Sequence, residues 1–415
     1  MARKMKDSGI EWIGEIPEGW KVVPVKRLCT MQAGKNLTSE QIAPEGTYPV
    51  YGGNGIRGFF SDYNCVGQFL TVGRQGALCG NVHKINGKVW ATEHAVITAP
   101  SSYAILDFLY YLLIGMDLNQ YVSSTAAQPG LAVGTLLNLK TCYPCSTLEQ
   151  TQISNYLNAK CSEIDTMLSK NRSSIEEYKK LKQAVITQAV TKGVRGEREM
   201  KDSGVDYIGQ IPAKWVLGKL RNIGDTQNGI SKSSDFFGKG FPFVSYSDVY
   251  KNYSLPFAVS GLVESTPEEQ ERYSVKEGDI FFTRTSETIE EVGFSCVCEK
   301  DIPNATFAGF LIRVRPFLDR LHTPYAKYYF RSSHLRFYLV KEMNLVTRAS
   351  LGQSLLKSMP VLLPPLEEQK EIADYLDAKC AEIDGLIAKK EQLVKELESY
   401  KKSLIYEVVT GKREV

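Results

Sequence analysis

Two stretches of the chain carry apolar residues at alternating spacings of three and four, the seven-residue rhythm of a helix that packs along one stripe. The first stretch spans residues 149–191 and contains no proline, and the second spans 366–415. At 1.5 Å per residue, the first stretch predicts a helix about 65 Å long. A helix of this length with one narrow stripe needs a partner, so we expect the two helices to form an antiparallel coiled coil.

The predicted pairing places the single polar residue of each stripe, Asn171 and Lys390, opposite each other. In that alignment the helix-pair core also contains Leu157, Ile164, Leu168, Ile175, Tyr178 and Val185, which face Leu404, Leu397, Leu393, Leu386, Ile383 and Leu376 in that order. A shift by one heptad would keep many of these apolar pairs, and each helix could instead pack on its own domain. The sequence leaves both alternatives open.

The chain also contains an internal repeat. The segment MKDSGIEWIGEIPEGW at 5–20 recurs as MKDSGVDYIGQIPAKW at 200–215, with 10 of 16 positions identical. We call these copies the Ile-Pro-Trp segments. The starts of the two helical stretches, 149–170 and 368–389, match at 12 of 22 positions. The repeat divides the chain into two domains and two helices, with the boundaries 1–147, 148–199, 200–365 and 366–415.

The variable regions within the two domains, 21–147 and 216–365, mix strand-like and helix-like patterns. Runs rich in Val, Ile, Tyr, Phe and Thr predict strands at Gln68–Val72, Val89–Thr98, Asp279–Thr283 and Phe307–Val314. Aromatic-rich runs predict helices at 107–122 and 326–340, and each region ends in a polar loop that contains threonine, 125–130 or 347–352. The expected fold is α+β, with two mixed α/β domains separated by two long antiparallel helices and related by a pseudo-two-fold repeat.

Composition adds limits to this picture. The chain of 415 residues is long enough for two or three domains. No apolar run approaches the roughly 20 residues of a membrane helix, and the start lacks the apolar core of a signal peptide. Nine scattered cysteines argue against a disulfide framework, so we expect a cytoplasmic protein with reduced thiols. The net charge of +3 indicates no particular partner, and any nucleic-acid binding would have to use local patches.

The repeated blocks resemble a known family. The paired Ile-Pro-Trp segments and the run PPLEEQKEIADYLDAKCAEIDGLIAKK at 364–390 look like those of type I restriction–modification DNA specificity subunits. The runs YPVYGGNGIRGF and GDIFFTRTSE are similar to the target-recognition domains of that family. One departure from the repeat is YPCSTLEQ at 143–150, where the second copy has LPPLEEQ.

The resemblance implies a function as well as a fold. Each domain would read one half of a bipartite site in double-stranded DNA, and helix length would set the gap between the halves. The helices would dock two modification subunits that methylate adenine, and restriction subunits would join them for translocation and cleavage. S-adenosylmethionine, ATP and Mg would then belong to these partner subunits, and this chain would need no cofactor.

Motifs for chemistry within the chain are missing or weak. The sequence has neither the Asn/Asp-Pro-Pro-Tyr/Phe motif that holds a flipped adenine nor a G-x-x-x-x-G-K-[ST] phosphate loop. Gly53, Gly55 and Gly58 fit G-x-G-x-x-G, but no helix pattern follows them, which favours a tight loop over a nucleotide site. Cys142 and Cys145 form one C-x-x-C without a second pair. We therefore expect a chain that is not a catalyst by itself.

Candidate DNA contacts are long polar side chains on loops, which can reach base edges and phosphates. The candidates are Arg57, Arg74, Gln75 and Gln128 in the first domain, and Arg284, Thr285, Ser286 and Arg348 in the second. Lys327, Arg331 and Arg336 could lie along phosphates or along a partner, whereas the aromatic residues around them are expected in the core. Two other functions stay open: a self-contained modification or restriction enzyme, and a coiled-coil scaffold that does not bind DNA.

Overall fold

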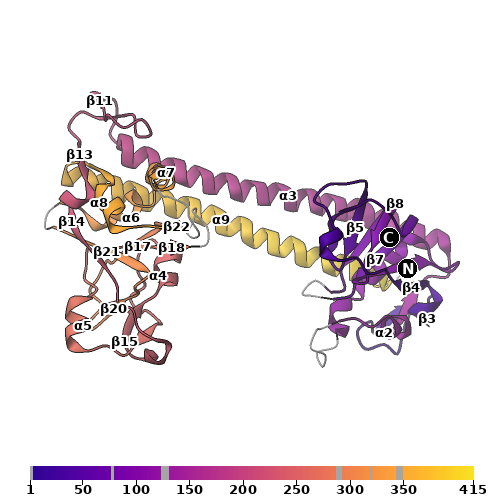
Figure 1. Ribbon diagram of the computed structural model, residues 1–415. Helices are drawn as coiled ribbons and strands as arrows, with labels where there is room; N and C mark the ends of the chain where they lie inside the picture. Colours follow the sequence, from indigo (N-terminus) through magenta and orange to yellow (C-terminus); the bar gives the residue numbers. More distant parts are fainter. Residues whose placement is uncertain (1–2, 76–78, 123–129, 287–291, 318–319, 343–348) are drawn as a thin grey trace. The chain divides into compact units, whose positions relative to one another are not determined.

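The computed structural model describes residues 3–75, 79–122, 130–286, 292–317, 320–342 and 349–415. The chain divides into two compact units. Unit 1 consists of Met1–Arg172 together with Glu391–Val415, and unit 2 consists of Ser173–Lys390. Each unit contains one variable region and a part of each long helix, α3 (Thr147–Lys192) and α9 (Leu366–Val409) (Figure 1). The two helices are thus shared between the units, whereas the sequence analysis treated them as separate segments.

Unit 1 is built on a six-stranded sheet with the order β4-β9-β7-β8-β5-β6. All neighbours in it are antiparallel except β5 and β8, which run parallel. The strands are β4 (Cys29–Ala33), β5 (Tyr48–Gly52), β6 (Gly55–Phe60), β7 (Cys65–Gly73), β8 (Val82–Ala91) and β9 (Ala95–Pro100). Helix α1 (Leu106–Gly115) packs on β7, β8 and β9 and buries Phe108, Leu109 and Leu112. The apolar core of the unit therefore lies between this sheet, α1 and the long helices.

Three smaller parts complete unit 1. A hairpin of two short strands forms the Ile-Pro-Trp segment, and a second strand pair closes the variable region. These elements are β1 (Met5–Asp7) with β2 (Glu15–Pro17), and β3 (Lys21–Pro24) with β10 (Lys140–Tyr143). The short helix α2 (Val133–Asn138) leads into β10. Because β3 and β10 pair, the two ends of the variable region meet at the start of α3.

Unit 2 repeats this layout with a more divided sheet. Its four-stranded antiparallel sheet has the order β14-β21-β17-β19. The strands are β14 (Gly224–Asn228), β17 (Ile280–Thr283), β19 (Ser295–Val297) and β21 (Leu311–Pro316). The pairs that match those of unit 1 are β11 (Met200–Asp202) with β12 (Gln210–Pro212), and β13 (Val216–Lys219) with β23 (Pro360–Leu363). The repeat seen in the sequence is thus also a repeat of strand pairing.

The longer variable region of unit 2 adds a second small core. It contains a three-stranded sheet, two short helices and a two-stranded pair near the end of the region. These elements are β15 (Phe237–Val244), β16 (Leu262–Val263), β20 (Thr306–Phe307), α4 (Tyr246–Lys251), α5 (Pro267–Arg272), β18 (Thr285–Ser286) and β22 (Ala349–Ser350). Helix α8 (Gln353–Ser358) then leads into β23, as α2 leads into β10. No helix among the described residues is long and apolar enough to cross a membrane.

Two of the four predicted strands are confirmed and two are wrong. Gln68–Val72 lies within β7, and β17 covers Ile280–Thr283. The predicted strand Val89–Thr98 is instead the end of β8, a turn at 92–94 and the start of β9. The predicted strand Phe307–Val314 is likewise broken between β20 and β21. Each break is only three residues long and lies between two strand-like runs, so the prediction joined two strands into one.

The predicted aromatic helix 326–340 is two helices, α6 (Thr323–Tyr329) and α7 (Ser333–Glu342). The predicted helix 107–122 ends as α1 at Gly115, shortly before Asp117 adopts a left-handed conformation with φ of 44°. The aromatic residues of α6 are in the core, as expected: Tyr325, Tyr328, Tyr329 and the following Phe330 are all buried. Phe337 on α7 is an exception, because it is 54% exposed.

The break between α6 and α7 turns Arg331 into the protein. Its guanidinium donates hydrogen bonds to the carbonyl oxygens of Ser295 (2.6 Å), Val249 (2.7 Å), Tyr250 (3.0 Å) and Asn252 (2.7 Å). It also lies over the rings of Tyr253 and Phe294, and burial lowers its pKa. Arg331 therefore binds carbonyl groups of β19 and of the end of α4, and does not lie on an open basic surface.

The stripe residues of α3 and α9 are buried within each unit, with two exceptions. Leu157, Ile164, Leu168, Asn171, Ile175, Leu376, Ile383 and Leu404 are buried, and Tyr178, Val185, Lys390 and Leu397 are partly buried. Leu386 and Leu393 are 37% and 39% exposed, so their predicted place in the core is wrong. Their neighbours Ile387 and Val394 are less exposed and continue the stripe. The alternating spacing correctly predicted the stripe. The predicted pairing, however, assigned Leu386 and Leu393 to it in place of their neighbours Ile387 and Val394.

Ion pairs between the helices also correct the predicted register. In unit 1 the ammonium of Lys401 lies 2.7 Å from both carboxylate oxygens of Asp165. In unit 2 Lys182 lies 2.6 and 2.8 Å from the carboxylate of Asp384. The predicted register would have placed Asp165 opposite Glu396 and Lys182 opposite Lys379. Like charges would then have met, which raises the energy of that alignment. The helices are antiparallel, but α9 is displaced by about five residues, or roughly 7.5 Å, from the predicted alignment.

Each helix start is joined to its Ile-Pro-Trp segment by the same three side chains. In unit 1 the indole nitrogen of Trp20 donates to Glu149 at 3.0 Å, and Arg3 pairs with the same carboxylate while lying over the Trp20 ring. In unit 2 Trp215 donates to Glu368 at 3.0 Å, and Arg198 pairs with Glu368 and lies over Trp215. We call each set the Trp–Glu–Arg clamp. Its glutamate sits in the first helical turn, where the helix dipole favours a negative charge.

The glutamine after each clamp glutamate ties the helix to the variable region. Gln150 accepts a hydrogen bond from the backbone of Ile105 at 2.9 Å and donates to the carbonyl oxygen of Pro144 at 3.0 Å. Gln369 does the same with His322 at 2.8 Å and Pro364 at 2.9 Å. The repeated Glu-Gln pair therefore has a structural role. It fixes where α1 or α6 begins relative to the long helix.

Removing the clamp glutamate should destabilise unit 2 more than unit 1. The Glu368 side chain is 3% exposed, whereas the Glu149 side chain is 27% exposed. We expect Glu368→Ala to cost about 3–5 kcal/mol, because it removes a buried carboxylate that binds both Trp215 and the partly buried Arg198. Glu149→Ala should cost only about 1–2 kcal/mol. Hydrogen exchange of amides in β2 and in β12 measures the two units separately, and equal losses would contradict the proposed effect of burial.

Replacing Arg331 by methionine should also destabilise unit 2. The substitution keeps much of the side-chain volume but leaves four carbonyl oxygens without their donor, so we expect a loss of at least about 3 kcal/mol. Arg221→Met is a matched control, because Arg221 is exposed on the short helix η4 (Leu220–Asn222). The measurement is urea denaturation of both variants, and an unchanged midpoint for Arg331→Met would show that the buried hydrogen bonds contribute little.

Candidate nucleic-acid interface

Two of the candidate segments in unit 1 lie next to each other. Arg74 and Gln75 follow β7, and the backbone nitrogen of Leu131 donates to the carbonyl oxygen of Arg74 at 2.8 Å. Gln75 forms a bridge with Gly130, and the Arg74 side chain donates to the carbonyl oxygen of Leu131 at 3.3 Å. The end of the polar loop that precedes α2 is thus held against the end of β7. Gln128 lies outside the described residues.

Unit 2 has the same arrangement at the end of β17. The backbone nitrogen of Leu351 donates to the carbonyl oxygen of Arg284 at 2.8 Å. Thr285 and Ser286 form β18, which pairs with Ser350 and Ala349 in β22. Arg348 lies outside the described residues. These segments were predicted from separate patterns in the two domains, and the structure brings the corresponding ones together in each unit.

A third segment joins each site and was missed by the sequence analysis. The backbone nitrogen of Arg74 donates to the carbonyl oxygen of His94 at 2.9 Å, and that of Arg284 donates to Phe310 at 2.9 Å. His94 and Phe310 occupy the two turns that were read as continuous strand. Phe310 is 65% exposed, and its backbone is bonded to that of Arg284. We call each set of three segments a recognition loop cluster, comprising 74–75, 94 and 130–131 in unit 1, and 284–286, 310 and 349–351 in unit 2.

The glycines near the cluster of unit 1 form a tight turn, as expected. Gly55, with φ of 96°, begins β6 directly after the turn that follows β5, and Gly58 has φ of 146°. A side chain at Gly53 would come within 2.9 Å of the carbonyl oxygen of Gln75, so the turn packs closely against the cluster. Arg57 is exposed on β6, and its side chain folds back beside Gly52. This hairpin borders the cluster and contains no helix that could face a phosphate.

The three candidate cations of the second aromatic run have other roles, which corrects their assignment as phosphate contacts. Arg331 is bound to four carbonyl groups, as described above. Lys327 lies 2.7 Å from Asp377 on α9 and over the Tyr328 ring. Arg336 donates to the carbonyl oxygen of Val292 and lies over the Phe294 ring. The sequence pattern shows how many charges a helix carries, but not that these side chains turn inward.

The cysteines and histidines do not assemble a site in the described part of the chain. No group of three or more His, Cys, Asp or Glu residues there could hold a metal ion. Cys142 is buried in β10, where burial raises the pKa of its thiol to about 12, while Cys145 is exposed. Cys161 and Cys380 are buried in the helix stripes, as expected for small core residues.

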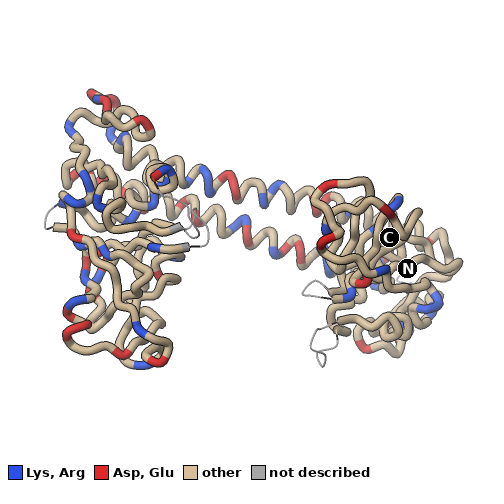
Figure 2. The backbone as a smooth tube through the Cα atoms, viewed as in Figure 1, with Lys and Arg blue, Asp and Glu red and all other residues tan. Residues whose placement is uncertain are grey.

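Charge is evenly mixed along the long helices. Figure 2 shows lysine and arginine alternating with aspartate and glutamate on both α3 and α9. Several of these charges pair across the helices within a unit, as Arg172 does with Glu398. Neither helix therefore presents a continuous row of basic residues.

Comparison with known proteins gives the family. The model for the type I restriction modification DNA specificity domain matches residues 17–177 and again 212–396. The specificity subunit of the type I restriction enzyme EcoprrI from Escherichia coli is 40% identical over 159 residues, which are 37% of this chain and 37% of that protein. The MjaVIII specificity subunit from Methanocaldococcus jannaschii is 25% identical over 416 residues, covering 96% of this chain and 93% of that protein.

A solved structure shares the fold. It comes from work on complex assembly and conformational transition of the type I R-M system, and it superposes with a TM-score of 0.71 at 17% sequence identity. The superposition covers 96% of this chain and 99% of the other. The two matches of the family model fall on the two copies found in the sequence, and together they span most of the chain. The chain belongs to the family of type I restriction–modification DNA specificity subunits.

Proposed function

We propose that this chain selects the DNA site of a type I restriction–modification complex, with each recognition loop cluster reading one half of a bipartite target. The observation that carries this proposal is the duplication of the cluster. The same three segments meet in both units, although the variable regions share little sequence. The two clusters share the same backbone arrangement but carry different side chains, so they are suited to reading two different half-sites.

Direct reading of bases requires donors and acceptors that reach into the major groove. Arg74 with Gln75 and Arg284 with Thr285 supply such groups at strand ends, where the backbone is held by hydrogen bonds. Arginine binds guanine in bidentate fashion, and glutamine binds adenine, so these residue types suit base contact. Positive and negative charges alternate along the two long helices. The loops are therefore better suited than the helices to supply sequence specificity.

The proposal extends to the rest of the complex. Two modification subunits would bind this chain and methylate adenine, and restriction subunits would add translocation and cleavage. S-adenosylmethionine, ATP and Mg would be bound by those subunits, and this chain would not be a catalyst by itself. The absence of an adenine-methyltransferase motif from the sequence favours this division over a self-contained enzyme.

The test of the proposed function is the pattern of adenine methylation in DNA. Cells that carry the complete system with this chain should methylate adenines in a split, non-palindromic sequence with several unspecified bases between its halves. Cells that lack only this chain should lose that methylation. Long-read sequencing that detects methyladenine provides the measurement. A contiguous target would contradict the bipartite proposal, and methylation by the purified chain alone would favour the self-contained enzyme.

Alanine substitutions in the loop clusters should separate the two half-sites. Arg74→Ala should relax one base in one half, and Arg284→Ala should relax one base in the other half. Each should cost about 1–3 kcal/mol of binding to the cognate duplex. Arg221→Ala, which removes an exposed arginine outside the clusters, is the control and should change neither affinity nor sequence preference. Binding is measured with the assembled complex on duplexes that vary one position at a time. If one substitution relaxed the base preference in both half-sites, the two clusters would not read their half-sites independently.

A further inference from the structure

The two units contain equivalent positions beside the long helices, and only one of them is filled. In unit 2 the ring of Tyr253 occupies this position. Its hydroxyl accepts a hydrogen bond from Gln183 on α3 at 3.2 Å. Lys182 lies 5.4 Å from the centre of its ring, Arg331 lies 4.6 Å from it, and the Tyr328 ring is 6.1 Å away. Tyr253 is therefore held by α3 and by the aromatic helix α6.

The surrounding residues have counterparts in unit 1. The Lys182–Asp384 ion pair corresponds to Lys401–Asp165, and Lys402 follows Lys401 as Gln183 follows Lys182. Tyr328 donates to Asp377 at 2.6 Å, and Tyr111 donates to Asn158, at the equivalent helix position, at 2.8 Å. Ile114 comes one turn after Tyr111, as Arg331 comes one turn after Tyr328. The four groups that surround Tyr253 thus correspond to Lys401, Lys402, Tyr111 and Ile114.

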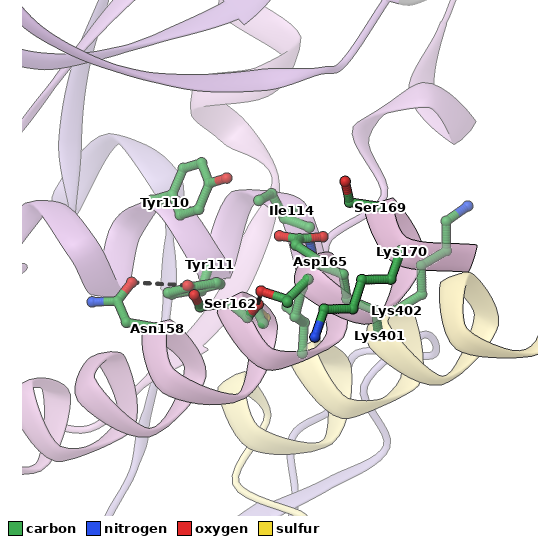
Figure 3. Close-up of a pocket in the computed structure, with 13 residues that line it drawn as sticks. Tyr110, Tyr111, Ile114, Asn158, Ser162, Asp165, Ser169, Lys170, Lys401 and Lys402 are labelled. Carbon is green, nitrogen blue, oxygen red and sulfur yellow. Dashed lines mark hydrogen bonds and ion pairs between the residues drawn. The ribbon is translucent and has the colours of Figure 1, made fainter. Parts of the chain in front are cut away.

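In unit 1 these four residues line an open groove. Its volume is about 770 Å³, and Figure 3 shows the groove between α1, α3 and the end of α9. Lys84 on β8 lies over the rings of Tyr110 and Tyr111, 4.5 and 5.3 Å from their centres, and the groove beside these rings is open. Tyr110, Tyr111 and Ile114 give the groove an aromatic and apolar wall, and Lys170 and Lys402 are exposed on it. We call this groove the unit 1 socket.

The socket differs from the filled position in its charge. Gln183 offers Tyr253 a neutral amide, but Lys402 offers an ammonium group in the same place. Neither Lys402 nor Lys170 has an ion-pair partner among the described residues. Lys401 is already paired with Asp165. A suitable ligand therefore brings a ring for the apolar wall and an anionic oxygen for the free lysines.

We propose that the unit 1 socket docks an aromatic side chain of a partner protein, a tyrosine or phenylalanine beside an acidic residue. The known occupant of the equivalent position is itself a tyrosine from a protein loop. Aromatic anchors in well-packed pockets dominate many protein interfaces. Duplex DNA would bring phosphates to the lysines but no free ring to the apolar wall, because its bases are stacked within the helix. A protein surface fits both features of the socket.

This inference rests on the proposed function for the identity of the partner, which would be a modification subunit of the same complex. It adds an asymmetry that the repeat alone does not suggest. Unit 2 fills its position with its own Tyr253, whereas unit 1 leaves the position for another chain. The two units would therefore offer a partner different surfaces at equivalent helix positions.

The experiment measures binding of the full-length chain to the purified modification subunit by calorimetry. Lys402→Glu should weaken binding at least tenfold, because it repels the acidic group of the partner. Ser162→Trp, which places a large ring in the socket from α3, should weaken it to a similar extent. Gln183→Glu is the matched control, because its position faces Tyr253 in unit 2, and it should change the affinity by less than twofold. Circular dichroism of each variant checks that the fold is kept.

The outcomes separate the socket from the proposed function. If the wild-type chain does not bind the modification subunit, the proposed function fails and this inference fails with it. If the wild-type chain binds but Lys402→Glu and Ser162→Trp bind equally well, only the socket is overturned. Weaker DNA binding by the Lys402→Glu complex, with a flatter salt dependence and unchanged subunit binding, would identify the groove as a phosphate contact and would also overturn the inference.

Discussion

The hydrogen bond from a buried tryptophan to the first-turn glutamate of a long helix is the contact on which each unit depends. Trp20 with Glu149 and Trp215 with Glu368 join segments 129 and 153 residues apart in sequence. The carboxylate also carries the charge that pairs with Arg3 or Arg198, so three groups must be in place together. The next residue, Gln150 or Gln369, then positions the helix that follows the sheet. The start of the long helix is thus coupled to the sheet and the following helix, which together carry the recognition loop cluster.

This coupling explains how two domains with little shared sequence keep one layout. The residues repeated between the copies include those of the clamp and the helix stripe, whereas the paired strands at the ends of the variable region repeat their pairing but not their residues. The cluster residues do not contribute to the clamp. Their backbones are held by hydrogen bonds between loops, which place few demands on side-chain identity. Substitution in a cluster can therefore change the surface offered to DNA at small cost to folding, which suits a family that reads many different sites.

The sequence predicted the repeat, the long helices and two strands because periodic patterns and identities record these features directly. It failed where the outcome depends on contacts between distant residues. The heptad stripe permits several registers, and the charges of Asp165 and Lys182 choose among them. The turns at His94 and Phe310 are short and lie between strand-like runs, so each pair of strands was predicted as one strand. Arg331 resembled a surface cation because its four carbonyl partners come from the end of α4 and from β19, far away in the chain.

The candidate site was predictable to a similar extent. Arg74 and Arg284 were predicted because they are long polar side chains on loops, which is where proteins often carry function. That they meet Leu131 and Leu351 was not visible, since the partner loops come more than fifty residues later. The filled position in unit 2 illustrates the same limit. Tyr253 belongs to a region with no counterpart in the first copy, so only the folded chain shows that it occupies a position left open in unit 1. Duplication gives the two units the same arrangement of clamp, long helices and strand pairs. The residues that differ between the variable regions then determine which surfaces of each unit stay open to partners.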